Sequence, residues 1–231
     1  PGHSSAASDV YKRQMLDPET CGPAFLSLPQ DIQGVAYDFP EVFFEEKIHR
    51  IRRPEPELAD LEDAKAALMK AEKPLIISGG GVHYSLATDE LKAFAEKHNI
   101  PVVETIAGRA TMLQDNPLNA GPIGVTGSDS ANYMAAHADV VLAIGTRLQD
   151  FTTGSWSVFR NPDMKLIAMN VARFDAIKHR ALAVKCDAQR GMAKLSQLLG
   201  DWRSSDDWAS TAKAQADEWK AVVQRLSLIH I

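Results

Sequence analysis

Residues 73–84 read KPLIISGGGVHY and join a short apolar run directly to three glycines. The run 75–78 has the length of a strand buried on both faces. Glycines directly after a strand let the backbone turn tightly and approach a ligand or a neighbouring helix. This stretch therefore predicts the first strand and first turn of a parallel α/β sheet, with a binding crevice beside the turn.

Strand and helix patterns alternate along the rest of the chain. The loop at 105–127 is rich in turn residues, and Asp60 and Asp63 form a candidate capping pair for the first helix. The alternation predicts an α/β fold with helices on both faces of a parallel sheet, which makes three layers. The expected strands are 75–78, 101–104, 139–144, 165–171 and 183–186, and the expected helices are 57–72, 86–97, 128–137 and one that Asp187 caps.

The two ends of the chain differ from its middle. Residues 1–14 and 226–231 have no periodicity that fits their neighbours, and both resemble translated adaptor sequence. Residues 15–56 contain a strand-like segment at 25–28 and a charged, proline-bounded linker at 41–56. The segment at 25–28 fits either an edge strand of this domain or, as we favour, the last strand of a preceding one. We expect the main domain at 57–202 and a helical linker at 203–225.

Composition excludes several classes of protein. Hydrophobic residues make up 45% of the 231 residues, charged residues 24%, and the net charge is -5, as in ordinary globular proteins. No apolar stretch is long enough to span a membrane, and the basic residues are too scattered for nucleic-acid binding. The two cysteines lack the spacing of a zinc site or a disulfide framework. We expect a cytoplasmic protein with small-molecule or protein partners.

The glycine run is the first candidate site. Backbone N–H groups of Gly79, Gly80 and Gly81 could hold a phosphate at a helix start. The dinucleotide fingerprint needs a third glycine further on, and Tyr84 stands at that position. A tight strand-to-helix turn without a ligand is an equally good interpretation.

Two further segments follow predicted strands or precede helices. Gly121, Gly124 and Gly127 recur at every third residue, which suits either close approach of a flat ligand or a kinked loop. Arg147 follows the strand at 139–144, where α/β sheets present ligand-binding residues. Its guanidinium suits an anionic ligand, or a carboxylate such as Asp150.

Other polar residues give weaker signals. His83, His137 and His179 are remote from any serine or cysteine in a nucleophile context, so a catalytic triad is not supported. Glu104, at a strand end, lacks a recognisable partner for acid–base chemistry. We expect the histidines to be surface or interdomain hydrogen-bonding residues, and Glu104 to be a helix-cap or salt-bridge partner.

Several segments together resemble the central domain of thiamine diphosphate-dependent enzymes. They are KPLIISGGGVHYS, IPVVETIAGRATM, NPLNAGPIGVTG and ADVVLAIGTRLQDFTTGSW, and the similarity covers residues 22–219. The resemblance implies a Rossmann-like, DHS-like NAD/FAD-binding fold inside a larger cytoplasmic homo-oligomer. It further implies that residues 15–56 end an N-terminal pyrimidine-binding domain and that a C-terminal domain follows.

The resemblance also implies an activity for the complete enzyme. The segments LPQDIQGVAYDFPEVFF, IGVTGSDSAN and RLQDFTTGSW are typical of members that hydrolyse a carbon–carbon bond of a cyclic diketone in inositol catabolism. In the family, thiamine diphosphate and Mg²⁺ are bound by a glutamate earlier in the first domain and by a GDG…N motif in the third. Neither occurs here, so no catalytic or metal-binding residue is expected and the chain alone should be inactive.

The resemblance also implies a set of crevice residues that could bind a cofactor. Acetohydroxyacid synthases, which resemble the chain in these glycines and Arg147, bind FAD in this domain. Here LQDFTTGSW replaces an arginine-rich stretch and Asn170 stands where a carboxylate is expected, so we predict no bound flavin. A self-contained FAD- or nucleotide-binding module, or an acetohydroxyacid synthase-like domain, is the alternative. The candidate cofactor-binding residues are Gly79, Gly80, Gly81, Gly124, Thr126, Gly127, Gly145, Thr146 and Arg147.

Overall fold

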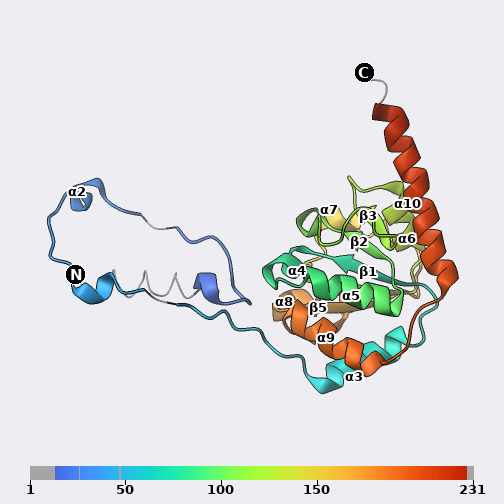
Figure 1. The fold of residues 1–231 in the computed structure, drawn as a ribbon, viewed down its shortest axis with the longest axis horizontal. Coiled ribbons are helices and arrows are strands. Elements are labelled where there is room, and N and C mark those ends of the chain that lie inside the picture. The colour runs from blue at the N-terminus through green and yellow to red at the C-terminus, as the bar shows by residue number, and fades with distance from the viewer. Residues whose placement is uncertain (1–13, 26, 47, 228–231) are drawn as a thin grey trace. The chain divides into compact units, whose positions relative to one another are not determined.

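The computed structural model describes residues 14–25, 27–46 and 48–227 (Figure 1). The chain divides into two compact units between Arg52 and Arg53. Most of the predicted adaptor-like ends, 1–14 and 226–231, lies outside the described residues.

The first unit has little regular structure among its described residues. It contains the short helices α2 (Gln30–Gln33) and η1 (Glu41–Phe43), and none of its described side chains is buried. An edge strand of this domain at 25–28 is wrong, because Phe25, Ser27 and Leu28 are not in a strand. The favoured alternative, the last strand of a preceding domain, stays a prediction. An isolated strand has no neighbouring strand with which its backbone groups can pair, and the oxygen of Leu28 instead accepts a hydrogen bond from the Gln33 side chain over 2.8 Å.

The second unit contains a six-stranded, all-parallel sheet in the order β3-β2-β1-β4-β5-β6. The predicted three-layer α/β fold is therefore confirmed. Chain order reverses direction between β1 and β4, which is where open sheets of this kind place their binding crevice. The strands are β1 (Pro74–Ser78), β2 (Val102–Glu104), β3 (Asn119–Pro122), β4 (Val140–Ile144), β5 (Lys165–Asn170) and β6 (Leu182–Lys185).

Alternate residues of the central strands enter two separate apolar clusters. Ile76 and Leu142 pack under α3 (Leu58–Leu68), α5 (Thr88–His98) and α9 (Ala188–Leu199). Leu75 and Val141 point the other way, toward α6 (Asp129–His137) and α10 (Asp206–Ser227). Figure 1 shows these two helical layers on opposite faces of the sheet. The period of two buries both faces of each central strand.

Several helix ends are capped, and the cap predicted at Asp187 is confirmed. Oγ of Ser128 accepts a hydrogen bond from the N–H of Ala131, and Asp187 caps α9 in the same way. Asn99 ends α5 in the left-handed conformation, with φ of 55°. The capping pair Asp60–Asp63 is wrong, because α3 begins at Leu58, one residue after Glu57, and no side chain caps it.

The loops after the strands hold more regular structure than predicted. The glycine run continues into a helical turn, α4 (Gly80–Tyr84), before α5 begins. The segment 105–127 contains η2 (Ile106–Gly108) and also β3, whose NAGP sequence lacks strand-forming residues. The edge position of β3 in the sheet tolerates its glycine and its proline. The remaining short helices are α7 (Asp150–Thr153), α8 (Arg173–Ala176) and η3 (Lys178–Arg180).

Helix α10 continues the fold beyond residue 202. Its first half packs on α6 and β3, and Trp208, Ala212 and Ala216 are buried there. Within the part of the chain that the structure describes, no helix is both long and apolar enough to cross a membrane.

Candidate functional site

The carboxyl ends of β1 and β4 lie side by side at the point where strand order reverses. Ser78 and Ile144 are register partners, so the residues after them meet. The N–H of Gly79 donates to the oxygen of Ile144 and the N–H of Gly81 donates to that of Gly145, each over 2.9 Å. The predicted crevice segments 79–81 and 145–147 are thus brought together.

Close backbone contact explains why glycine stands at these positions. A Cβ on Gly79 would lie 2.4 Å from the oxygen of Gly145, and one on Gly81 would lie 2.6 Å from the Gly145 Cα. Gly145 itself has φ of +59°, a conformation that favours glycine. A Cβ on Gly80 would meet the Cβ of Ala107 at 3.1 Å. The glycines let the loops after the three neighbouring strands β2, β1 and β4 pack against one another.

The same contacts bear on phosphate binding. Two of the three N–H groups in the run, those of Gly79 and Gly81, are already hydrogen-bonded within the protein. A phosphate cradle relies on N–H groups that point at the ligand. The geometry therefore favours tight packing of the turn over a phosphate cradle.

The loop around Gly124 and Gly127 is held by a side chain that sequence patterns did not single out. The amide of Asn132 donates to the oxygen of Gly124 and accepts from its N–H, both over 3.0 Å. The N–H of Val125 donates to the oxygen of Phe151 over 2.9 Å, so this loop lies against α7. Thr126 is exposed at the tip of the loop. The one sequence feature that could have pointed to a role for Asn132 in this loop was its position in the first turn of α6.

Thr146 and Arg147 differ in their surroundings. The hydroxyl of Thr146 accepts from the N–H of Leu148 over 3.2 Å, and its main-chain oxygen accepts from the amide of Asn170. Arg147 is exposed, and its guanidinium has no partner among the described residues. Asp150 instead accepts from the hydroxyl of Ser155 over 2.7 Å. Arg147 is therefore available to a ligand or to another protein surface.

The other polar candidates have structural partners. Glu104 is buried and accepts a hydrogen bond from the N–H of Met112 over 3.1 Å. Rings of His83 and His137 bond to main-chain oxygens at 2.8 Å, and the ring of His179 lies 4.4 Å from that of Trp156. Burial, and next the charge of Lys178, lowers the pKa of His179.

The described residues offer no reactive thiol or metal cluster in this domain. Burial, followed by the charge of Asp187, raises the pKa of Cys186 to about 12, so its thiol stays protonated at neutral pH. Within the described chain, no three His, Cys, Asp or Glu side chains gather as metal ligands would.

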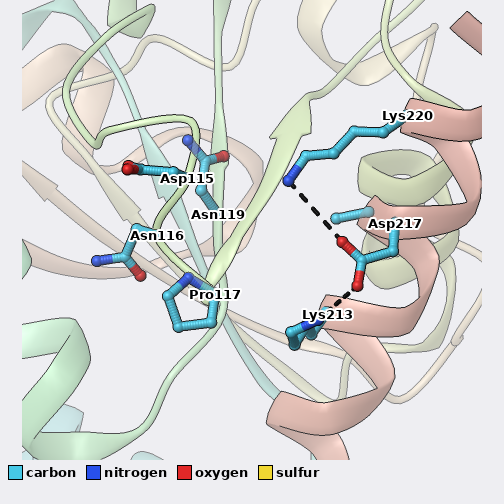
Figure 2. Close-up of a pocket in the computed structure, with 8 residues that line it drawn as sticks. Asp115, Asn116, Pro117, Asn119, Lys213, Asp217 and Lys220 are labelled. Atoms are coloured by element: carbon cyan, nitrogen blue, oxygen red, sulfur yellow. Dashed lines mark hydrogen bonds and ion pairs between the residues drawn. The ribbon is translucent and has the colours of Figure 1, made fainter. Parts of the chain in front are cut away.

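Two shallow depressions flank α10, away from the glycine crevice. The larger, about 170 Å³, lies between Lys213, Asp217 and Lys220 of α10 and the segment that enters β3 (Figure 2). Asp217 contacts Lys213 over 2.5 Å and Lys220 over 3.9 Å, and the hydrogen bond from Lys213 lowers its pKa. The smaller depression, about 120 Å³, lies between α10 and the start of α6. No predicted crevice residue lines either one.

Comparison with known proteins adds evidence that is independent of the geometry. Residues 61–195 match the family described as thiamine pyrophosphate enzyme, central domain. The chain is 42% identical over 214 residues to the 3D-(3,5/4)-trihydroxycyclohexane-1,2-dione hydrolase of Clostridium tetani, which covers 93% of this chain and 33% of that protein. The hydrolases of the same name from Clostridium perfringens and Geobacillus thermodenitrificans are 43% and 41% identical, over 94% and 93% of this chain and 34% and 33% of theirs.

The chain thus spans about a third of the length of the curated relatives that it matches. The family match covers more than half of the chain and includes the whole sheet, since β1 begins at Pro74 and β6 ends at Lys185. The chain belongs to the thiamine pyrophosphate enzyme family and contains its central domain.

Proposed function

We propose that the chain is the central part of a larger thiamine diphosphate-dependent hydrolase that opens trihydroxycyclohexane-1,2-dione in inositol catabolism. The observation that carries this proposal is the identity of about 42% with hydrolases of that name over 93% of the chain. Residues 53–231 make up only about three quarters of the chain, so the similarity extends into the first unit. The similarity is therefore not confined to one shared domain, and this supports the proposal that the chain is part of a longer hydrolase.

The residues present do not fit thiamine diphosphate or Mg²⁺. The GDG…N motif that the family uses for Mg²⁺ and diphosphate is absent from the sequence. We assign both groups to other parts of the longer polypeptide and no catalytic step to this chain. The 231 residues alone should be inactive.

The crevice residues would then contribute to the wall of an active site completed by other domains. Thr126 and Arg147 are the exposed polar side chains among the predicted crevice residues, and both lie in loops after strands. Thr153, in the same region, is buried, and its hydroxyl bonds to main-chain oxygens at the start of its own helix. Thr126 and Arg147 are therefore the better candidates for residues of this wall.

A bound flavin is not part of this proposal. Asn170 at the end of β5 uses its amide to bond Thr146 and Ala172, so its side chain is engaged within the protein. A ribose contact at this position in nucleotide-binding sheets is made by a carboxylate. The N–H groups of Gly79 and Gly81 are likewise engaged.

The decisive experiment uses the complete reading frame. Sequencing of genomic DNA on both sides should reveal an upstream domain with a glutamate and a downstream GDG…N motif. The complete protein should open the dione only with thiamine diphosphate and Mg²⁺ added, whereas the 231-residue chain under the same conditions should not. Turnover by the 231-residue chain would refute the division of roles proposed here.

Titration with FAD, NAD and ADP tests the alternative, a self-contained nucleotide-binding module. We expect no calorimetric signal and no flavin absorbance in the purified chain. Binding of any of the three with a stoichiometry of one would favour the module over the central domain of a hydrolase. We also propose a homo-oligomeric complete enzyme in the cytoplasm, which gel filtration and cell fractionation would test.

A further inference from the structure

An apolar patch follows the carboxyl edge of the sheet. Each of five neighbouring strands is followed by a loop or short helix with a large exposed hydrophobic side chain. The exposed fraction reaches 85% for Tyr84 after β1 and 72% for Phe174 after β5. The patch, called here the carboxyl-edge patch, consists of Tyr84, Ile106, Val125, Phe151, Phe174 and Ile177.

Contacts between neighbouring loops hold these side chains at one edge of the sheet. Helix α4 packs on η2, which brings the loops after β1 and β2 together. The bond between Val125 and Phe151 joins the loops after β3 and β4. The rings of Trp156 and His179 join those after β4 and β5. Helices α4, α7 and α8, which carry part of the patch, can be followed in Figure 1.

Exposed arginines are present in the same loops as several of these hydrophobic side chains. Arg109, Arg147, Arg173 and Arg180 are in the loops after β2, β4 and β5. None of the four guanidinium groups has a hydrogen bond or ion pair with a described residue. By contrast, Arg53, Arg190 and Arg203 each pair with a carboxylate.

The acidic residues near this edge do not balance the arginines. Asp175 pairs with Lys178 over 2.6 Å, and Asp150 bonds to Ser155. Asp129, at the start of α6, is exposed. The carboxyl-edge patch is therefore apolar with an excess of unpaired positive charge.

We infer that the carboxyl-edge patch docks an acidic, partly apolar protein surface supplied by the rest of the longer polypeptide. Apolar and aromatic side chains together with arginine are characteristic of protein interfaces. A guanidinium left without a partner is suited to paired hydrogen bonds with a carboxylate. The source follows from the relatives, which are about three times as long as this chain. In that respect the inference rests on the proposed function.

Other occupants fit less well. A symmetric contact between two copies through this patch would bring together two surfaces that each carry an excess of positive charge, which is unfavourable. A small anion would satisfy the arginines but would leave the exposed hydrophobic side chains of the patch without a partner. A protein surface with carboxylates around an apolar centre satisfies both features of the patch.

Labelling of arginine with phenylglyoxal, followed by peptide mass spectrometry, tests the inference. The four arginines should react several-fold more slowly in the complete protein than in the 231-residue chain. Arg160, an exposed arginine without a partner in the segment that enters β5, is the matched control and should react equally in both. Equal rates for the four arginines in both proteins would overturn the inference.

Further outcomes separate the competing occupants. Protection that disappears once small molecules are stripped at high salt would indicate an anionic ligand and overturn the inference. Protection of the four arginines that grows with the concentration of the 231-residue chain would indicate self-association and would also overturn the inference. A complete protein that turns over the dione but leaves the four arginines reactive contradicts the docking surface alone. Protected arginines without turnover contradict only the proposed function.

A charge reversal provides a second measurement. Arg109→Glu with Arg173→Glu should lower the urea midpoint of the complete protein yet leave that of the 231-residue chain unchanged. Circular dichroism of the shorter variant checks that the substitutions do not prevent folding. Arg160→Glu should leave both midpoints unchanged. An equal midpoint for the double variant and the unchanged complete protein would count against docking.

Discussion

The side-chain amide of Asn170 donates a hydrogen bond to the main-chain oxygen of Thr146 over 3.0 Å. The Oδ1 atom of the same side chain accepts from the N–H of Ala172, also over 3.0 Å. Asn170 ends β5 and Thr146 follows β4, so one amide fixes two loops at the carboxyl edge. A carboxylate accepts but does not donate, and it would repel the Thr146 oxygen.

Replacement of Asn170 by aspartate should therefore destabilise the domain. We expect Asn170→Asp to lower the free energy of unfolding by about 1–3 kcal/mol, because a buried hydrogen bond is replaced by repulsion between oxygens. Urea denaturation followed by circular dichroism measures this change. Gln114→Glu makes the same chemical change at an exposed residue without a partner and should stay within about 0.5 kcal/mol. Wild-type stability of Asn170→Asp would mean that the amide does not fix these loops.

The contact between Gly81 and Gly145 gives a second prediction. A Cβ on Gly145 would lie 2.6 Å from the Cα of Gly81, on a residue whose φ is already +59°. Overpacking of this kind costs about 1–3 kcal/mol, and the positive φ adds about 1–2 kcal/mol for alanine. Gly145→Ala should thus be among the most destabilising single substitutions at this edge.

Gly200→Ala is the control that separates these two causes. Gly200 also has a positive φ, +58°, but no atom of a neighbouring residue lies within 4 Å of the point that a Cβ would occupy there. Thermal unfolding of the two variants should show a clearly larger loss for Gly145→Ala. Equal losses of stability in the two variants would mean that backbone conformation causes the whole effect. The close contact between Gly81 and Gly145 would then contribute nothing.

Much of the fold was predictable because each central strand is buried on both faces. Runs such as VVLAI at 140–144 are apolar throughout and end in glycine, so periodicity and turn signals coincide. β3 was missed because its NAGP sequence has neither signal. It forms only because β2 offers it hydrogen bonds, which is information carried by distant residues.

The candidate site was predictable in position and less so in its contacts. Strand ends placed Gly79 and Gly145 at one edge, as the topology of parallel sheets requires. Sequence could not reveal that the N–H of Gly81 would bond to Gly145, or that Asn132 would hold Gly124, because both contacts depend on how separate loops pack. Patterns along the chain report local structure, whereas pairs of this kind are set by tertiary packing.

His98 links α5 to the turn before α10 and gives a prediction about pH. Its ring lies 2.6 Å from the oxygen of Trp202 and 2.9 Å from Oγ of Ser196. Burial lowers the pKa of His98, and the bond to Trp202 opposes this only in part. Above the unfolded pKa of about 6.5 the ring is neutral in both states and stability is full. As pH falls below that value, the unfolded chain binds a proton first, so the free energy of unfolding falls until the lower folded pKa is reached.

Urea midpoints at pH 7.5 and pH 5.5 test this sign. The midpoint should fall toward pH 5.5, and the fall should be smaller in His98→Gln, which has no imidazole to protonate. A fall of equal size in His98→Gln and wild type would assign the pH dependence to other groups.

Trp208 anchors α10 beneath the start of β1, and its removal tests whether this helix belongs to the domain. Its indole N–H donates to the oxygen of Pro74 over 2.8 Å, and Lys73 Nζ lies 5.9 Å from the ring centroid. Trp208→Ala should lower the free energy of unfolding by about 3–5 kcal/mol, as for other buried aromatic side chains. Trp208→Phe removes the hydrogen bond and should cost about 1 kcal/mol or more. Hydrogen exchange along α10 should rise in both variants.

Trp219 of the same helix provides the comparison. It lies beyond Ala216, the last buried residue of α10, and is only half-buried. Trp219→Phe should therefore change stability by less than about 0.5 kcal/mol, as substitutions outside the core usually do. If Trp208→Phe and Trp219→Phe are equally mild and hydrogen exchange along α10 is unchanged, the helix acts as a linker. A much larger loss of stability in Trp208→Phe than in Trp219→Phe would show that the first half of α10 is part of the folded domain. A contact made by this helix can affect the free energy of unfolding of the domain only if the helix is packed on the sheet.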